Sequence, residues 1–539
     1  MSRPDDQLPP VWKAAFERER GFAKPALADP LPERRLSRLL AAFIASGLLF
    51  MVLPGTLIGV WNLLSISAQR ESTSAPAAWI QAHGHAQLFG WVGTFIIGIS
   101  MYAVPKFRGA WIRSLPLAWA AFALWVSGVT LRWCAGITGQ HAHWALPAAA
   151  LAELAAVLLV IYEITPRSAS KRQQGAWNTL IFSGFAGLAV LLAFQFVVVL
   201  RIEGAIVPAW ANHILLNMAL WVFCVPAVMG FSAKFLPSLL ALRRASDHAA
   251  YGGLALIVIA FAGSLAGFEK FSSGLILAAV LLLAHWLGVF HRSTGRAKTI
   301  GMDARYPLFA RGAFAWLVVS AILAIWAEKP GVLGASRHAF TVGFLATLIF
   351  SIGPRILPTF LNSRELWSKR LVFWALVLLS AGCAIRVTTE PLAYAGVANY
   401  AWSLLPASAI LELTAVLLFA SNMAVTLLRP MPAWMDLKLV TAELKVYWLV
   451  SSYPDTRRIL INAGLGTIGR APAIPRTLTL AEAAEADGVQ AENMVHLLKA
   501  YFEPRLAKAA RANQSARKAL SGGNLQCGPG RGADHAVRG

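Results

Sequence analysis

Long runs of apolar residues recur along most of this chain of 539 residues, and they limit its possible folds more than any other feature. Hydrophobic residues make up 57% of the sequence and charged residues only 14%, whereas soluble domains carry about 25% charged residues. A run of about 18 or more apolar residues is long enough to cross a bilayer as an α-helix. The sequence therefore predicts an all-α membrane protein embedded in a lipid bilayer.

Twelve such runs predict twelve transmembrane helices. The expected spans are about 39–64, 79–104, 115–136, 144–164, 176–200, 209–233, 251–268, 272–291, 308–327, 336–358, 370–388 and 404–428. Lys and Arg gather in the connections that follow the even-numbered spans, and by the positive-inside rule this predicts that both termini are cytoplasmic. The net charge of +22 then reflects membrane topology, and we expect no nucleic-acid partner.

The regions that flank the spans differ in composition from the membrane part. We expect four parts: a polar cytoplasmic leader over 1–37, the twelve-helix domain over 38–430, a small helical cytoplasmic domain over 435–506, and a disordered basic tail over 507–539. Thr479 and Glu482 have the spacing of a capping box before a helix of the small domain.

One pattern of residues occurs twice, in spans 2 and 10. The matching pairs stand at one constant spacing: His85 and His338, Gly90 and Gly343, Thr94 and Thr347, and Pro105 and Pro358. Spans 4 and 12 also match, and each carries an intramembrane carboxylate, Glu153 and Glu412. These repeats predict three pseudo-repeats of four helices. We expect both carboxylates to face inward, either to move protons or to bond a partner such as a tryptophan N–H.

His85 and His338 are the first candidate ligands, because ionisable side chains inside a membrane usually indicate function. If the repeats are related by rotation, the two imidazoles face one another across a gap, as the two axial ligands of a haem iron do. The chain has no CxxCH motif, so the haem would be of b type. Gly90 and Gly343 would let the macrocycle approach the backbone; close helix packing is the alternative for the glycines, and interhelical hydrogen bonds for the histidines.

Three further histidines are candidate metal ligands. His83 lies about 200° around the helix from His85, so the two cannot face one iron; His83 would bind a second centre or a lipid headgroup. His213 in span 6 is a candidate ligand for copper, which imidazole suits. His285, in the middle of span 8, is expected to be buried and is the third candidate.

The two histidine-containing stretches resemble the NnrS family, polytopic bacterial membrane proteins linked to nitric oxide metabolism and denitrification. The resemblance covers all twelve spans and is clearest in HGHAQLFG of span 2 and RHAFTVGFLATLIFSIGPRILPTF of span 10. The family motif reads HAHEMLFG, so its glutamate is replaced here by Gln87. Members are described as containing haem and copper, which implies haem b and copper here, a small gas ligand such as nitric oxide, and a place in the bacterial inner membrane.

A more distant resemblance is to the catalytic subunit of the haem–copper oxidases. That subunit also has twelve helices in three groups of four, with histidines on helices 2 and 10 that hold one haem. His85 and His338 match those positions, and His213 lies on the helix that provides a copper ligand. Span 7 has no histidine pair and span 10 has a single histidine, so a conventional centre that reduces oxygen or nitric oxide cannot be assembled.

The residues of the small C-terminal domain resemble the small helical domain at the N-terminus of iron–sulfur cluster repair di-iron proteins. Its stretch GLGTIGRAPAIP has no cysteine where those domains often have them. The resemblance therefore implies an interaction module and no cluster chemistry.

Three functions remain open from the sequence. The first is a haem protein of the nitric oxide response and denitrification, with b-type haem between spans 2 and 10. The second is a nitric oxide or oxygen reductase with an unusual metal centre, fed by a quinol or a cytochrome, so enzymatic activity is an open question. The third is a transporter whose intramembrane histidines and glutamates bind substrate or protons.

Overall fold

The structure is a computed structural model, and it describes residues 9–12, 14, 30–108, 110–165, 175–295, 297, 302–361, 366–429, 440–453, 455–471, 474–475 and 477–504. The predicted tail over 507–539 lies outside the described residues, as does most of the predicted leader over 1–37. The chain divides into two compact units. One runs from Leu31 to Pro430, and the other joins the N-terminal residues up to Phe22 to the chain after Met431.

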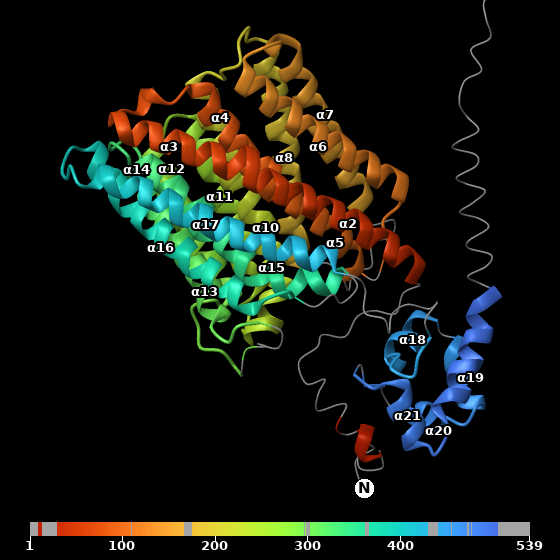
Figure 1. The fold of residues 1–539 in the computed structure, drawn as a ribbon. Helices are drawn as coiled ribbons and strands as arrows, with labels where there is room; N and C mark the ends of the chain where they lie inside the picture. The colour runs from red at the N-terminus through yellow and green to blue at the C-terminus, as the bar shows by residue number, and fades with distance from the viewer. Residues whose placement is uncertain are drawn as a thin grey trace, which may run out of the picture. The chain divides into compact units, whose positions relative to one another are not determined.

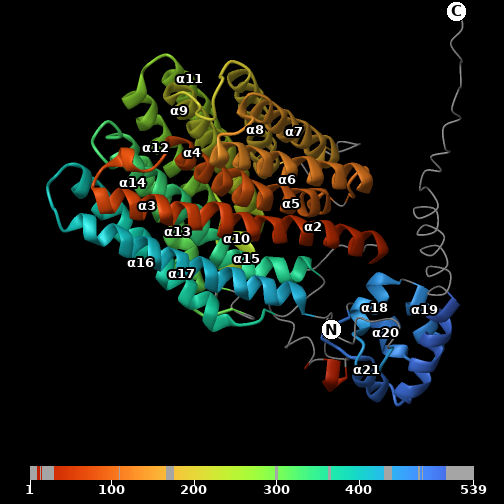
Figure 2. The ribbon, with the colours of Figure 1, turned by 45° about the horizontal axis from the view of Figure 1, so that its top comes forward.

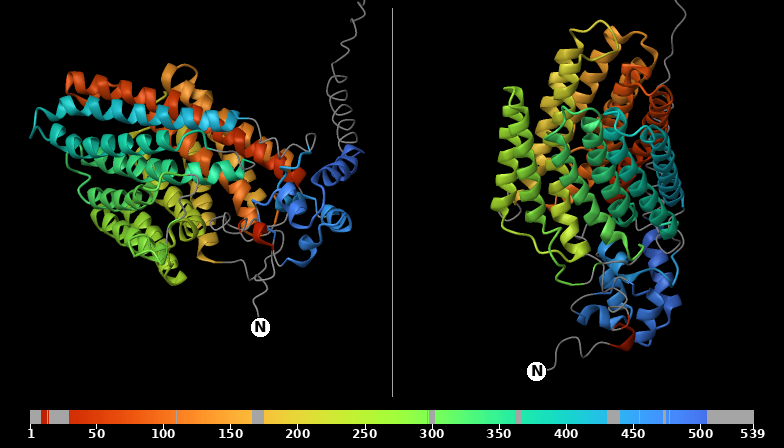
Figure 3. Two further views of the ribbon diagram at one scale, coloured as in Figure 1. Left: turned by 60° about the horizontal axis from the view of Figure 1, so that its bottom comes forward. Right: turned by 90° about the vertical axis from the view of Figure 1, so that its left-hand side faces the viewer.

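Twelve helices in the described part of the chain are long and apolar enough to cross a membrane, which confirms the predicted all-α membrane fold. Figure 3 shows them as a bundle of long helices with short connections. The first span is one continuous helix that starts at Pro30, earlier than the expected end of the leader at residue 37, because polar residues can extend a helix beyond the apolar run that defines a span.

The helices of the membrane unit follow the three predicted groups of four spans. Group one contains α2 (Pro30–Phe50), η2 (Met51–Leu57) and α3 (Ile58–Gln69), then α4 (Ala77–His85), η4 (Ala86–Gly93) and α5 (Thr94–Phe107), then α6 (Leu115–Thr138) and α7 (Ala142–Ile164). Group two contains α8 (Ala176–Val199), then α9 (Ala209–Asn217), η6 (Met218–Cys224) and α10 (Val225–Leu240), then α11 (Asp247–Leu265) and α12 (Glu269–Leu287). Group three contains α13 (Tyr306–Ala324), then α14 (Val332–His338), η7 (Ala339–Ala346) and α15 (Thr347–Phe360), then α16 (Lys369–Tyr394) and α17 (Ala401–Leu428).

The second span of each group lies inside the bundle. The most apolar windows of spans 2, 6 and 10 are 94%, 72% and 67% buried, the three highest values among the spans. Span 1 lies beside span 12, since α3 packs against α17 (Figures 1 and 2). The first and last groups are therefore neighbours, and this arrangement brings their repeated residues into one region of the bundle.

Each inner span contains a π-helical segment at the same place. η4 follows His85, η7 follows His338, and η6 follows Asn217. The Thr94 hydroxyl donates to the carbonyl of Phe89 at 3.2 Å, and the equivalent Thr347 bonds the carbonyl five residues before it at 3.1 Å. π-Helical turns are rare and frequently occur at functional sites, so these segments mark the level of the repeated histidines.

Two inner spans pack closely against outer ones through glycine. A Cβ added at Gly98 would lie 2.6 Å from Cβ of Phe43, and one at Gly230 would lie 2.6 Å from the backbone oxygen of Trp177. A backbone atom cannot turn aside as a side chain can, so Gly230 sets the separation of α8 and α10.

Replacing Gly230 with alanine is expected to lower the free energy of unfolding by about 1–3 kcal/mol, since the new methyl group overpacks the interface. Thermal unfolding of the purified protein in detergent measures this change. Gly274→Ala is the matched control, because no atom lies within 4 Å of a Cβ at this exposed helical site. The explanation is wrong if both variants unfold at the same temperature.

The C-terminal unit is a small helical bundle with its own core. It contains α18 (Val446–Ser452), α19 (Asp455–Asn462), α20 (Gly466–Arg470), α21 (Leu480–Ala486) and a last helix over 491–504. The predicted capping box is confirmed: the Glu482 N–H donates to the Thr479 hydroxyl, and the Thr479 N–H donates to the Glu482 carboxylate. Trp12 is fully buried in this same core, a contribution from the N-terminal region that the sequence did not indicate.

Candidate functional site

His85 is the centre of a buried polar cluster in the first group of helices. Its Nε2 lies 2.8 Å from a carboxylate oxygen of Glu153, and Nε of Arg132 donates to its Nδ1 at 3.1 Å. The other carboxylate oxygen of Glu153 accepts a hydrogen bond from the Gln195 amide at 3.1 Å. Glu153 is fully buried, so the expectation that this carboxylate faces inward is confirmed, with a histidine as its partner and not a tryptophan.

A glycine on α6 makes room for this carboxylate. A Cβ at Gly128 would lie 2.9 Å from Cγ of Glu153, so a larger residue would displace the glutamate. Arg132 follows one helical turn later and points its guanidinium group at His85. Its Nη1 is buried and has no hydrogen-bond partner among the described residues.

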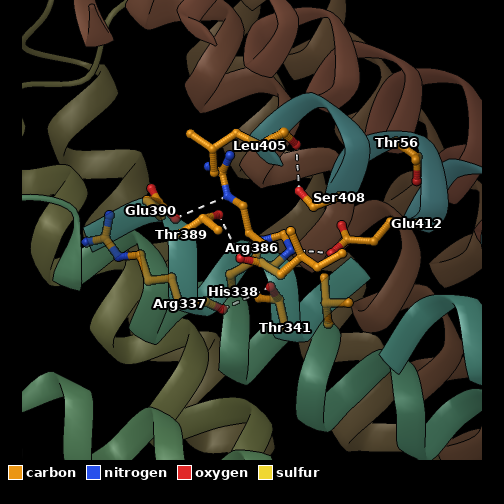
Figure 4. A network of polar contacts seen from close by, with 12 residues as sticks. Thr56, Arg337, His338, Thr341, Arg386, Thr389, Glu390, Leu405, Ser408 and Glu412 are labelled. Carbon is orange, nitrogen blue, oxygen red and sulfur yellow. Dashed lines mark hydrogen bonds and ion pairs between the residues drawn. The ribbon is translucent and has the colours of Figure 1, made fainter. Parts of the chain in front are cut away.

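His338 has an equivalent glutamate and glycine around it in the third group. Its Nε2 lies 2.8 Å from a carboxylate oxygen of Glu412 (Figure 4), and a Cβ at Gly382 would lie 2.6 Å from Cγ of Glu412. Arg386, one turn after Gly382 on α16, lies 3.1 Å from the carboxylate of Glu390 in an ion pair. This second cluster is the more open one, since the His338 side chain is 24% exposed against 5% for His85.

The two clusters are therefore built from the same parts. The second span supplies a histidine, the third a Gly-x-x-x-Arg segment, and the fourth a glutamate. The histidines and glutamates were found from the sequence, whereas Arg132 and Arg386 were missed. The signal was present, because GVTLR at 128–132 and GCAIR at 382–386 occupy equivalent places on the third span of each group.

The second cluster contains buried guanidinium donors that lack hydrogen bonds. Nε of Arg337 and both Nε and Nη1 of Arg386 have no hydrogen-bond partner among the described residues. The contact between Arg386 and Glu390 is short enough for an ion pair, but its geometry does not make a hydrogen bond. In Figure 4 the guanidinium groups of Arg337 and Arg386 flank Glu390, so two arginines surround a single carboxylate there.

His83 belongs with the second cluster, although it stands two residues from His85. Its Nδ1 lies 2.8 Å from the carbonyl oxygen of Gly55, and His338, Arg386 and Glu412 all interact with it electrostatically. The expectation that His83 and His85 face different directions is thus confirmed. A carbonyl can only accept, so Nδ1 of His83 carries the proton and Nε2 has a free lone pair.

The structure places the other predicted haem-site residues in tightly packed surroundings. Both ring nitrogens of His85 are hydrogen-bonded, so an iron bound to His85 would have to replace its bond to Glu153 or its bond to Arg132. A Cβ at Gly90 would lie 2.9 Å from the Phe50 ring, and one at Gly343 would lie 2.6 Å from the Trp316 ring. The roles assigned to these three residues remain predictions.

The second group has Asn217 in the slot that His85 and His338 occupy in the others. Asn217 bonds Nε2 of His213 at 2.9 Å, and His213 also lies 3.8 Å from the carboxylate of Glu269. Both His213 and Asn217 line a cavity of about 360 Å³ between α9, η6, α11 and α12. No set of three His, Cys, Asp or Glu side chains within the described ranges is grouped to hold a metal ion, so copper at His213 remains a prediction.

His285 differs from its predicted environment. It lies in the last turn of α12 and is exposed, whereas the sequence placed it, buried, in the middle of the span. Its ring packs against His291 at a centroid distance of 5.1 Å. The expected burial is wrong because His285 lies on the outward side of α12, one turn after the exposed Leu281, whereas Ala284 and Trp286 beside it are buried. Its role as a metal ligand remains a prediction.

Comparisons with known proteins agree with this architecture. A solved structure described as a heme-copper terminal oxidase dimer matches with a TM-score of 0.59 and 12% sequence identity, over 87% of this chain and 99% of that chain. At this identity the match shows a shared fold, which confirms the distant resemblance. No curated protein matches the chain. A family model described as NnrS protein matches residues 38–431, which reach into all twelve spans, and the chain therefore belongs to the NnrS family.

Proposed function

We propose that this protein binds b-type haem between its second and tenth spans and acts in the bacterial response to nitric oxide. In this proposal it lies in the inner membrane with both termini in the cytoplasm. The observation that carries it is that His83 and His338, which interact electrostatically, are each held by a hydrogen bond at one ring nitrogen. Family membership and the oxidase-like fold support it.

The donor set near His338 fits a haem iron. Glu412 accepts from Nε2–H of His338, and the Gly55 carbonyl accepts from Nδ1–H of His83. Each neutral ring therefore keeps a lone pair on its other nitrogen, and a carboxylate or carbonyl partner of this kind orients an imidazole ligand and raises its basicity. This pairing differs from the one expected from the repeat, because the donors favour His83 over His85 as the ligand from span 2.

The arginine N–H donors that lack hydrogen bonds also fit a haem. A haem carries two propionate carboxylates, and guanidinium groups bind carboxylates through short, strong hydrogen bonds. Arg337 and Arg386 provide buried donors without hydrogen-bond partners in the described part of the chain, next to His338, and Arg386 is ion-paired with Glu390. They would hold the propionates and supply positive charge that the single Glu390 does not balance.

When bound, the haem would supply one-electron transfer, and it would take up a diatomic gas only where one of its two histidine ligands gives way. His83 and His338 would hold the iron, and Glu412 would fix the orientation of the His338 ring. Arg337 and Arg386 would anchor the edge of the macrocycle. Copper would rely on His213, beside which Asn217 and Glu269 are the polar neighbours.

The experiment that tests the proposal is a reduced-minus-oxidised spectrum of the detergent-purified protein, combined with a pyridine haemochrome assay. We expect the bands of b-type haem and a spectral change when nitric oxide is added. Protein from haem-replete cells that contains no haem would contradict the proposal and favour a transporter. Consumption of nitric oxide with a quinol or cytochrome donor would instead identify a reductase.

A further inference from the structure

A small apolar cavity lies in the centre of the membrane unit, between the three inner spans. Its volume is about 110 Å³, and its walls come from η4 and α5, from α10, and from η7 and α15. The side chains around it are aliphatic or aromatic, apart from the hydroxyl of Ser232. This cavity is separate from both histidine clusters, since none of their residues lines it.

The walls of the cavity are equivalent faces of the repeated spans. Span 2 contributes Val92, Phe95, Ile96 and Ile99, which have the helical spacing of a single face. Span 10 contributes Leu345, Leu348, Ile349 and Ile352, at the same spacing along the chain that separates His85 from His338. The three inner spans thus turn the same face toward a common space, so the cavity follows from the repeat.

We propose that this cavity is a binding site for a small apolar gas molecule. An engineered apolar cavity of about 150 Å³ stays dry and binds xenon or benzene, whereas a buried water needs two to four polar partners. Here a single hydroxyl faces the space, so water is poorly held. A volume of about 110 Å³ admits a diatomic gas or a xenon atom.

The site lies close to the level of the proposed haem ligands. Val92 follows His83 by nine residues and Leu345 follows His338 by seven, or roughly 10–14 Å along the helix. A gas held there would be stored next to the site where the proposed function needs it. The inference deepens that function, but the binding of gas to the cavity does not require haem.

Xenon is the probe that tests the cavity. We expect the purified protein in lipid nanodiscs to bind xenon, measured by the ¹²⁹Xe NMR shift as protein is added. Ile352→Trp fills the space and should weaken binding by about tenfold or more, because the cavity volume is removed. Ile352→Ala enlarges the same space and should strengthen binding, which tests the site even if the tryptophan variant folds poorly.

Ile410→Trp is the matched control, since Ile410 on α17 is 55% exposed on the outside of the unit, and it should bind xenon as the parent protein does. Equal shifts for the parent and both Ile352 variants would overturn the proposal, because xenon would then reside only in the lipid. The two proposals fail separately: a protein without haem that binds xenon contradicts the proposed function alone, and a haem protein without bound xenon contradicts this one alone.

Discussion

Replacing His338 with alanine is expected to lower the haem content of the purified protein by about tenfold or more. Loss of a residue that only orients a metal ligand typically costs 10–100-fold in affinity, and loss of the ligand itself should cost at least as much. The pyridine haemochrome assay, normalised to protein concentration, measures the change. His143→Ala is the matched control, because His143 is an exposed histidine at the start of α7.

The same assay separates the two histidines of span 2. His83→Ala should lose haem as His338→Ala does, because His83 is hydrogen-bonded at Nδ1 alone and interacts electrostatically with His338. His85→Ala should retain haem, since His85 is already bonded at both ring nitrogens. Haem that is lost in His85→Ala and kept in His83→Ala would restore the pairing expected from the sequence repeat. Haem that is kept in all three variants would rule out these ligands.

Replacing Glu153 with alanine is expected to lower the free energy of unfolding by about 3–5 kcal/mol, the cost of leaving a buried charge without its partner. Glu153 bonds His85 and Gln195, and it is the carboxylate that balances the nearby charge of Arg132. Thermal unfolding in detergent, followed by tryptophan fluorescence, measures the loss.

Two variants make this result specific. Glu412→Ala should cost less, because Glu412 is 13% exposed and Arg386 forms its ion pair with Glu390. Glu203→Ala, in an exposed connection, should leave the unfolding temperature unchanged. If Glu153→Ala unfolds at the temperature of the parent protein, the charge of Arg132 does not depend on Glu153 and this explanation is wrong.

The membrane fold could be predicted from the sequence because the property that defines a span is local. Each span is long enough and apolar enough by itself to cross a bilayer, so neighbouring residues along the chain were sufficient evidence. Which side of a helix faces the interior was less certain, as α12 shows: His285 lies on its exposed side, one turn after Leu281. Trp12 was not predicted in the C-terminal core, because one aromatic residue in a polar region has no periodic pattern around it.

The candidate site was only partly visible in the sequence. The repeat identified His85 with His338 and Glu153 with Glu412 as equivalent pairs. It did not reveal that each histidine bonds the glutamate of its own group, since the direction of a side chain depends on how its helix is rotated. π-Helical turns just after the histidines change how the side chains of each span are rotated about its axis. No pattern in the sequence predicted these turns.

By itself, the sequence determined twelve membrane spans, their grouping in fours and the equivalence of the repeated residues. All of these follow from apolar length and from spacing along one chain. The tertiary structure alone decided which residues meet: His85 with Arg132, and His83 with the cluster of His338. It also decided that the three inner spans together line an apolar cavity. Contacts between helices depend on how the helices pack, and spacing along the chain does not reveal this packing.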